Sequence, residues 1–208
     1  MVKLLYIESS PRKKRSASIE VAHTFLQEYK RKHADDTIQT IDLWSKNLPA
    51  FDGEVIDAKY QILSRHSFSE AEKRAWKPVE DIIAEFKDAD KYLFSLPMWN
   101  FSIPYKLKHY IDLLVQPGYT FTMTPEGGFK GLIDNKPVLL IYARGGAYPA
   151  GTPGEAFDLQ KRYMETILGF IGFKDFKSII IESTGNPDSK NAALEKAKRE
   201  ALEQAAQF

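Results

Sequence analysis

The stretch YLFSLPMWNFSIPYKLKHYIDLL, residues 92–114, combines an apolar run, a loop and a helical pattern in direct succession. Residues 92–96 are apolar apart from one serine and end at a proline, which predicts a buried strand. Pro104 is tolerated in the first turn of a helix, and one apolar stripe follows it at helical spacing, formed by Leu107, Tyr110, Ile111 and Leu114. Open α/β sheets bind ligands at the carboxyl ends of their strands, so the loop over residues 97–101 is a candidate binding segment.

The same alternation of strand and helix patterns continues along the chain. Four more apolar runs predict strands, at residues 3–8, 37–43, 138–142 and 178–181. Four more periodic stretches predict helices, at residues 16–33, 69–86, 157–170 and 191–206. Ser16 is a candidate N-cap, SEAE at residues 69–72 matches a capping box, and residues 45–68 have weak periodicity, which favours an inserted excursion. The pattern predicts an α/β fold: a doubly wound, five-stranded parallel sheet with helices on both faces.

The composition limits the possible classes of protein. A chain of 208 residues with 43% hydrophobic residues can bury the core of one domain, and we expect residues 1–208 to form a single domain. The 29 Lys and Arg residues nearly balance the 28 Asp and Glu residues, which argues against nucleic acid and acidic membrane surfaces as partners. The absence of cysteine excludes disulfides and thiolate chemistry. Without a signal-peptide pattern or an apolar run of about 18 residues, we expect a soluble, cytoplasmic protein.

The loop that follows residues 3–8 is rich in hydroxyl groups. The side chains of Ser10, Ser16 and Ser18 could hold a terminal monophosphate, together with the backbone N–H groups of Ala17 and Ser18 at a helix start. The alternative is that these serines only cap the helix. Residues 12–15, RKKR, lie in the same loop, and we interpret them as a solvated run that attracts anions at long range without direct contact.

Two further loops suit a planar heteroaromatic ligand. The loop after residues 92–96 combines flat apolar surface with an amide that both donates and accepts. Its residues are Pro97, Met98, Trp99, Asn100 and Phe101. In the loop after residues 138–142, two glycines let the backbone approach a ligand closely. Its residues are Ala143, Arg144, Gly145 and Gly146. The alternatives are an aromatic core cluster and an ordinary Gly-Gly turn, but loops that follow parallel strands are expected to converge on one crevice.

Other patterns associated with catalysis are missing from the sequence. It contains neither G-x-G-x-x-G nor a P-loop, which argues against a dinucleotide-binding Rossmann turn and an NTPase. The four histidines are scattered, without H-E-x-x-H, and no G-x-S-x-G elbow is present. We therefore expect neither a metal site nor a catalytic side chain.

Four segments together resemble the FMN-dependent NADH-azoreductases, flavodoxin-like quinone and azo-dye reductases. The segments are residues 3–18 with their late SAS, PMWNF followed by SIPYKLKHYID, ARGG, and LGFIG at residues 168–172. The resemblance implies FMN, with its phosphate at Ser10 and residues 16–18 and its ring at residues 98–101 and 143–146. This sequence departs from the family pattern at Ala143, where serine is frequent, and at Trp99, where tyrosine also occurs.

The resemblance also implies an activity and an assembly. Family members take hydride from NADH or NADPH and reduce a small-molecule quinone or azo acceptor, and we expect a two-electron, ping-pong mechanism. They are homodimers with the active site at the subunit interface, and Phe121 is our candidate substrate-binding residue that covers the partner's flavin. Phe121 could equally pack within its own subunit.

Three alternatives use the same loops. A flavodoxin-type electron carrier would be strongly acidic for docking, which the near-neutral charge argues against. A phosphodiester hydrolase would need metal ligands or an activated nucleophile, and the sequence offers neither. A non-catalytic FMN-binding module would bind the flavin without oxidising NAD(P)H.

Overall fold

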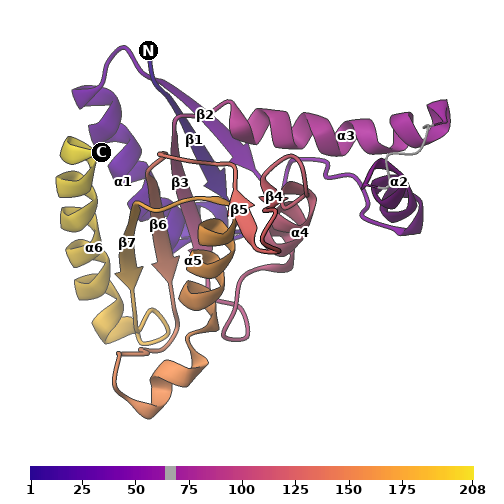
Figure 1. The fold of residues 1–208 in the computed structure, drawn as a ribbon. Coiled ribbons are helices and arrows are strands. Elements are labelled where there is room, and N and C mark those ends of the chain that lie inside the picture. The colour runs from indigo at the N-terminus through magenta and orange to yellow at the C-terminus, as the bar shows by residue number, and fades with distance from the viewer. Residues whose placement is uncertain (64–68) are drawn as a thin grey trace.

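The computed structural model describes residues 1–63 and 69–208, so residues 64–68 of the predicted excursion lie outside the described part of the chain. Five strands form one parallel sheet in the order β2-β1-β3-β6-β7 (Figure 1). Their bounds are Lys3–Glu8 for β1, Thr37–Asp42 for β2, Lys91–Pro97 for β3, Val138–Ala143 for β6 and Phe176–Ile181 for β7. The predicted doubly wound α/β fold is confirmed.

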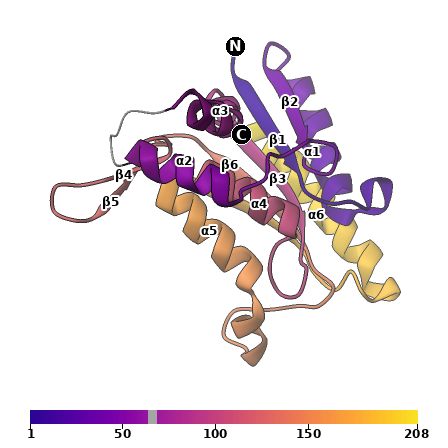
Figure 2. The ribbon, with the colours of Figure 1, turned by 90° about the vertical axis from the view of Figure 1, so that its right-hand side faces the viewer.

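Helices cover both faces of the sheet (Figure 2). The α-helices are α1 (Ala17–Lys32), α2 (Gly53–Leu63), α3 (Glu70–Lys87), α4 (Tyr105–Leu114), α5 (Leu159–Ile171) and α6 (Pro187–Gln207). Helices α1 and α6 pack on one face, and α3, α4 and α5 pack on the other. Two short 3-10 helices, η1 (Lys13–Arg15) and η2 (Pro153–Phe157), lie in the loops after β1 and β6.

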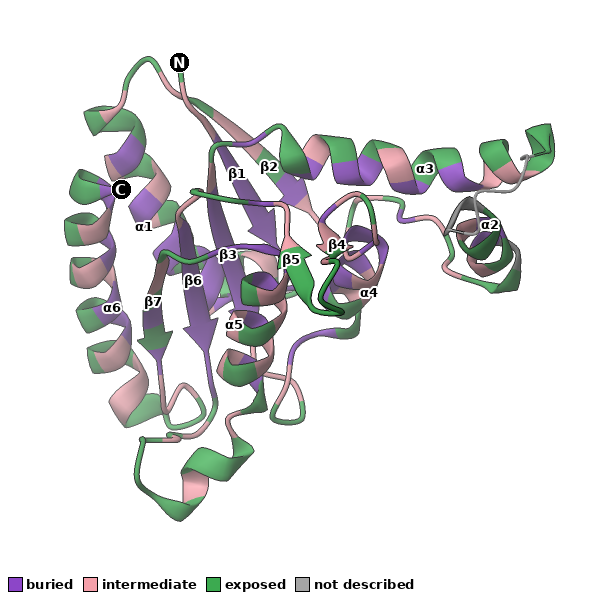
Figure 3. Ribbon diagram, in the orientation of Figure 1, coloured by how far each residue is buried: buried purple, intermediate pink, exposed green. Residues whose placement is uncertain are grey.

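The central strands are buried on both faces, which explains their nearly continuous apolar sequences (Figure 3). Successive side chains of a strand point to opposite faces. In β6, Leu139 and Ile141 therefore pack in the core beneath α1 and α6, whereas Leu140 and Tyr142 pack in the core beneath α3, α4 and α5. This alternation determines which face each residue near the strand end points to.

Most element boundaries match the sequence prediction, and three features differ. Helix α2 lies within the excursion, where weak periodicity had predicted no element, and it contacts α3. A two-stranded antiparallel sheet, β4 (Phe121–Met123) with β5 (Phe129–Gly131), was not predicted because three-residue strands show no measurable alternation. Pro104 is the N-cap of α4 rather than a residue of its first turn.

The two predicted N-caps differ in whether the side chain makes a capping hydrogen bond. The capping box of α3 is confirmed, because Ser69 accepts a hydrogen bond from the Glu72 amide and the Glu72 side chain accepts from the Ser69 amide. Ser16 is the N-cap of α1, as predicted, but its side chain makes no capping hydrogen bond. The first-turn amides of α1 therefore receive no acceptor from their own cap.

Short hydrogen bonds join the carboxyl ends of neighbouring strands. The Ser9 amide donates to the Ser95 carbonyl over 3.1 Å, and the Met98 amide donates to the Ala143 carbonyl over 2.7 Å. The Arg144 amide continues the series to the Ile181 carbonyl over 2.8 Å. The loops after β1, β3, β6 and β7 consequently begin side by side at one edge of the sheet.

Gly131, at the end of β5, should not tolerate a side chain. A Cβ built there would lie 2.2 Å from backbone atoms of Ile171 and Gly172 at the end of α5, and backbone atoms cannot move aside easily. Gly131→Ala should lower the free energy of unfolding by about 2 kcal/mol through overpacking, measured by urea denaturation. Gly53→Ala, where a Cβ meets nothing within 4 Å, is the control and should change stability little. Equal stability of the two variants would contradict the close packing of β5 on α5.

Candidate functional site

A cavity of about 290 Å³ opens at the carboxyl ends of β1, β3 and β6, and we call it the strand-end cavity. Eight of the predicted site residues line it: Ser10, Ser16, Ala17, Pro97, Met98, Trp99, Ala143 and Gly145. Five lining residues were not among the predicted site residues: Arg12, Arg15, Thr184, Gly185 and Lys190. The three predicted loops thus meet at one cavity, and the loop after β7 adds a fourth wall.

The wall formed by the first loop suits an anion. Ser16 lines the cavity at the N-terminus of α1, where the first amides of a helix lack intrahelical acceptors. Ser18 is fully buried behind it, with its hydroxyl oxygen 3.2 Å from that of Ser16, and does not line the cavity. Ser10 is also buried, and its hydroxyl accepts a hydrogen bond from the Arg12 amide. Hydroxyls and free amides therefore stand together at the positive end of a helix dipole.

Three residues with cationic side chains line the strand-end cavity. Arg12 and Arg15 are exposed at the surface and also line the cavity. Our interpretation of residues 12–15 as a solvated run without direct contact to a ligand stays a prediction, and these two residues are the ones that adjoin the cavity. Lys190, from the first turn of α6, also lines the cavity. Thr184, Gly185 and Lys190 follow the strand predicted at residues 178–181, just as the other site loops follow predicted strands. That position is the sequence signal that would have identified them.

Lys13 fixes the shape of the first loop. Its backbone has φ of +48°, and its ammonium group bridges Glu8 at the end of β1, over 2.7 Å, to Asp42 at the end of β2. Burial raises the pKa of the Asp42 carboxyl, but hydrogen bonds from Lys13, Ser45 and the Trp44 amide lower it by more, so the net pKa lies below its ordinary value. The ion pair holds residues 10–16 against two strand ends.

The backbone of the fourth loop is held by the segment after β7. The carbonyl groups of Arg144, Gly145 and Gly146 accept hydrogen bonds of 3.0, 3.2 and 3.1 Å from the amides of residues 184, 185 and 183. Because N–H and C=O point in opposite directions across a trans peptide, the amides of Gly145 and Gly146 point away from residues 183–185. A Cβ added at Gly145 would meet nothing within 4 Å, so open space adjoins this backbone.

Gly185 allows this close approach of two backbone segments. A Cβ at that position would lie 3.1 Å from the Gly145 carbonyl oxygen, closer than ordinary contact. Glycine at this position therefore permits the hydrogen bond that turns the fourth loop.

The third loop is a tight two-residue turn. Trp99 and Ser102 exchange two backbone hydrogen bonds of 2.9 Å, and the residues between them, Asn100 and Phe101, have φ of +47° and +67°. Positive φ at both central positions is the geometry of a type I′ turn, in which asparagine is favoured. Phe101 is 44% exposed and packs on Phe157 and Tyr148 outside the strand-end cavity.

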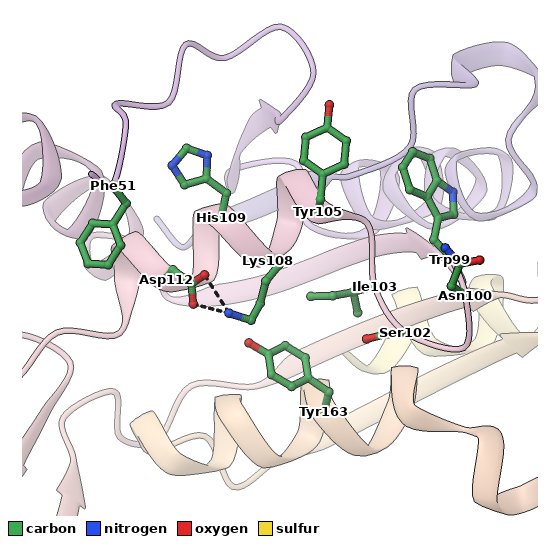
Figure 4. Close-up of a pocket in the computed structure, with 10 residues that line it drawn as sticks. All are labelled: Phe51, Trp99, Asn100, Ser102, Ile103, Tyr105, Lys108, His109, Asp112 and Tyr163. Atoms are coloured by element: carbon green, nitrogen blue, oxygen red, sulfur yellow. Dashed lines mark hydrogen bonds and ion pairs between the residues drawn. The ribbon is translucent and has the colours of Figure 1, made fainter. Parts of the chain in front are cut away.

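A second cavity of about 800 Å³, which we call the aromatic cavity, adjoins the third loop (Figure 4). Trp99 lines both cavities, and Asn100 lines only the aromatic one. The other lining residues are Phe51, Ser102, Ile103, Tyr105, Lys108, His109, Asp112 and Tyr163. Trp44 packs against Trp99 and Tyr105 at centroid distances of 5.8 and 5.5 Å, and its indole N–H donates to the Ser9 carbonyl. The shared Trp99 wall is thereby tied to the first loop.

The ionisable groups of the aromatic cavity are largely paired. Lys108 contacts both carboxylate oxygens of Asp112, at 2.6 and 2.7 Å (Figure 4). The His109 ring nitrogen Nε2 lies 2.9 Å from the Pro49 carbonyl oxygen. Burial raises the pKa of Tyr163 to about 12, so its phenol is neutral near pH 7. The cavity therefore offers flat apolar surface and neutral hydroxyls rather than a free charged catalyst.

Besides Ser18 and Phe101, three more predicted site residues lie outside both cavities. The Arg144 side chain is 1% exposed and turns away from the strand-end cavity toward α5 and the end of β7. Gly146 lies beside the Tyr148 ring. Phe121 packs in its own subunit against Phe129 and Phe170, at 5.9 and 4.7 Å between ring centroids.

Comparison with known proteins identifies the family. The family profile described as "Flavodoxin-like fold" matches residues 2–205. An "FMN-dependent NADH:quinone oxidoreductase" of Desulfotalea psychrophila is 50% identical over 203 residues, which cover 97% of this chain and 95% of the relative. The chain belongs to the flavodoxin-like FMN-dependent NADH:quinone oxidoreductase and azoreductase family. A second family member of the same name, from Nitratidesulfovibrio vulgaris strain DP4, is 47% identical and covers 98% of this chain and 100% of the relative.

Solved members of this family share the whole fold. The crystal structure of an azoreductase from Bacillus anthracis str. Sterne has a TM-score of 0.91 at 31% identity and covers 100% of both chains. An FMN-dependent NADH-azoreductase from Bacillus anthracis str. Ames Ancestor, solved in complex with FMN, has a TM-score of 0.90 at 29% identity, with 100% and 99% of the two chains covered. Helix α2 and the β4-β5 hairpin are thus part of a fold that aligns over its full length.

Two further findings concern residues 1–63 and 69–208 only. None of the helices described there has both the length and the apolar character needed to cross a bilayer. Within those ranges, no group of three or more acidic or histidine side chains is placed to hold a metal ion.

The ion pair of Asp42 predicts a pH-dependent stability. Because the pKa of Asp42 lies below 3.8 in the folded protein, its carboxylate contributes stability above that pH and loses the contribution as the pH falls through the folded-state pKa. Asp42→Asn should lower the free energy of unfolding by about 1 kcal/mol at neutral pH, and the difference from wild type should narrow below pH 3.8.

Urea denaturation at neutral pH and at pH values below 3.8 measures the difference in unfolding free energy between Asp42→Asn and wild type. Asp35→Asn, at an exposed position, is the control. A penalty for Asp42→Asn that does not depend on pH would contradict the assigned ion pair.

Proposed function

We propose that this protein is an FMN-dependent oxidoreductase that takes hydride from NADH or NADPH and reduces quinones and azo compounds by a two-electron, ping-pong mechanism. The observation that carries the proposal is the strand-end cavity, which has an anion-binding wall at one end and a flat indole with open backbone at the other. The names of the relatives agree with it, since both are FMN-dependent NADH:quinone oxidoreductases.

The residues around the strand-end cavity fit FMN. Ser10, Ser16 and the amides at the start of α1 would hold the phosphate, with Arg12, Arg15 and Lys190 supplying positive charge. Trp99 offers a flat apolar face, and Gly145 adjoins unfilled space where a ring can approach the backbone. Ser18 would act indirectly, through its contact with Ser16.

The chain's own task is to bind, orient and exclude water. When bound, FMN supplies the two-electron chemistry itself, so no side chain of the protein needs to act as nucleophile or base. The outward-facing amides of Gly145 and Gly146 are rigid donors for a carbonyl edge, and fixed donors of this kind stabilise negative charge without reorganisation.

We assign the aromatic cavity to the nicotinamide donor and to the electron acceptor in turn. Its lining of Phe51, Trp99 and Tyr105 suits flat rings, and its neutral Tyr163 phenol can hydrogen-bond a quinone oxygen. Since donor and acceptor use the same space, the first product must leave before the acceptor enters, which gives ping-pong kinetics. A cavity of about 800 Å³ has room for acceptors of several shapes.

We also propose that the protein works in the cytoplasm as a homodimer with the site at the subunit interface. Phe121 lies on the β4-β5 hairpin, where the neighbouring Met123 and Phe129 are 67% and 62% exposed. Apolar side chains exposed in this way on a hairpin are suited to contact with a second subunit, where Phe121 would cover the partner's flavin.

The proposed function predicts a coloured, FMN-stabilised enzyme. Purified protein should retain FMN on dialysis, and saturating FMN should raise the unfolding free energy by about 2.7 kcal/mol at a hundredfold excess over Kd. NADH oxidation should depend on added quinone, and double-reciprocal plots at several quinone concentrations should be parallel. Protein that neither retains FMN nor gains thermal stability from it would contradict the proposal.

The first-loop wall of the strand-end cavity, which suits an anion, predicts that Arg15 distinguishes FMN, which carries a phosphate, from riboflavin, which does not. Arg15→Gln should weaken FMN binding about tenfold or more, because a hydrogen bond to a charged group is lost, and should leave riboflavin binding unchanged. Lys14→Gln is the matched control, since it removes the same charge from the neighbouring exposed position, which does not line the strand-end cavity.

Flavin fluorescence quenching measures all of these affinities. If both substitutions weaken FMN binding equally, the loop acts by long-range attraction, and direct contact by Arg15 is refuted.

A further inference from the structure

Arg144 is the most deeply buried charged side chain beside the proposed flavin site. It follows directly after β6, is 1% exposed, and its guanidinium lies over the rings of Tyr142 and Tyr148 at 5.6 and 5.9 Å. Its Nη2 atom pairs with Asp158, the N-cap of α5, at 2.8 Å, and its Nη1 atom lies 3.4 Å from Glu182 after β7. The side chain thus joins the start of the fourth loop to two other elements.

Gln160 extends this cluster to the third loop. It is fully buried in the first turn of α5, its side-chain oxygen accepts from Nε of Arg144 at 3.3 Å, and its side-chain nitrogen donates to the Leu96 carbonyl at 3.2 Å. Leu96 directly precedes Pro97, where the third loop begins. One amide side chain therefore connects the two loops that we assign to the flavin ring.

The other end of the cluster reaches the amides of the fourth loop. Glu182, which pairs with Arg144, also accepts a hydrogen bond from the Tyr148 amide at 3.1 Å. The Arg144 carbonyl accepts from both the amide and the hydroxyl of Thr184, at 3.0 and 2.8 Å. The hydrogen bonds to the Arg144 carbonyl fix the peptide plane that contains the Gly145 amide, and the hydrogen bond from the Gly185 amide to the Gly145 carbonyl fixes the next plane, which contains the Gly146 amide.

Stability alone gives little reason to bury such a cluster. Apolar side chains of similar volume commonly stabilise a core as well as a buried ion pair does, whereas polar networks fix a single geometry. Neither Arg144 nor Gln160 lines either cavity, so direct contact with a ligand does not account for them.

We propose that Arg144 and Gln160 are positioning residues that fix the spacing between the third and fourth loops and hence the aim of the Gly145 and Gly146 amides. This inference rests on the proposed function, because the amides are aimed at FMN. It gives the Arg144 side chain an indirect role in the cofactor-binding loop to which we assigned residues 143–146.

The test is Gln160→Met, which keeps the length of the side chain and removes both hydrogen bonds. Its matched control is Gln116→Met, because Gln116 is 1% exposed, donates to the Asp112 carbonyl at the end of α4, and lines neither cavity. Three quantities are measured: Kd for FMN and for riboflavin by fluorescence quenching, the midpoint potential of bound FMN, and the melting temperature of the apoprotein.

Gln160→Met should raise the Kd of FMN and of riboflavin by the same factor, about 3- to 30-fold, because it disturbs the ring loops and not the phosphate wall. The midpoint potential should become more negative, since misaligned amides stabilise the reduced, negatively charged ring less well. Gln116→Met should leave both Kd values within about twofold of wild type and the midpoint potential unchanged, at a comparable cost in melting temperature. This combination separates positioning from a general loss of stability.

Arg144→Lys provides a second test if Gln160→Met unfolds. Lysine keeps the positive charge beside Asp158 but lacks the planar fork that also reaches Gln160, so the same shift in potential is expected. An unchanged potential in either folded variant, or a change in the ratio of riboflavin to FMN affinity, would overturn the inference. Wild-type protein that binds no flavin would instead refute the proposed function, on which the inference depends.

Discussion

Parallel pairing of β1, β3, β6 and β7 is the constraint on which the rest of the structure depends. In a parallel sheet every strand ends at the same edge, so loops that are far apart in sequence begin beside one another. Backbone hydrogen bonds across these ends, such as Met98 to Ala143 and Arg144 to Ile181, set the loops to within a hydrogen-bond length. Backbone hydrogen bonds therefore set the positions of the loops, and side chains of these loops line the site.

The polar groups of the site divide between its two ends. Serine hydroxyls, helix amides and cationic side chains gather at the start of α1, whereas the edge near Trp99 presents rings and peptide groups. Lys13 holds the loop that carries the serines in place, by pairing with Glu8 on β1 and Asp42 on β2. A ligand with a charged tail and a flat head matches this division, which is why an FMN-dependent function follows from the shape as well as from the relatives.

Much of the fold could be predicted because buried parallel strands are continuous apolar runs and amphipathic helices repeat every 3.6 residues. The strand-end position alone located the loops that line the cavity. The β4-β5 hairpin could not be predicted, because its pairing depends on packing against α5 rather than on its own pattern. The face of the sheet toward which the Arg144 side chain points was not predicted, although the alternation of side chains along a strand determines it. Tyr142 faces α5, so the side chain two positions later faces α5 as well.

The indole of Trp99 is a wall common to two cavities, and this has a thermodynamic consequence. Any occupant of one cavity that favours a particular tilt of the ring changes the affinity of the other cavity for its own occupant. By linkage the effect is reciprocal: the factor by which a flavin alters the affinity for an acceptor equals the factor by which that acceptor alters the affinity for the flavin. If flavin and acceptor occupy the two cavities as we propose, retention of the flavin and choice of the acceptor are coupled through one aromatic side chain.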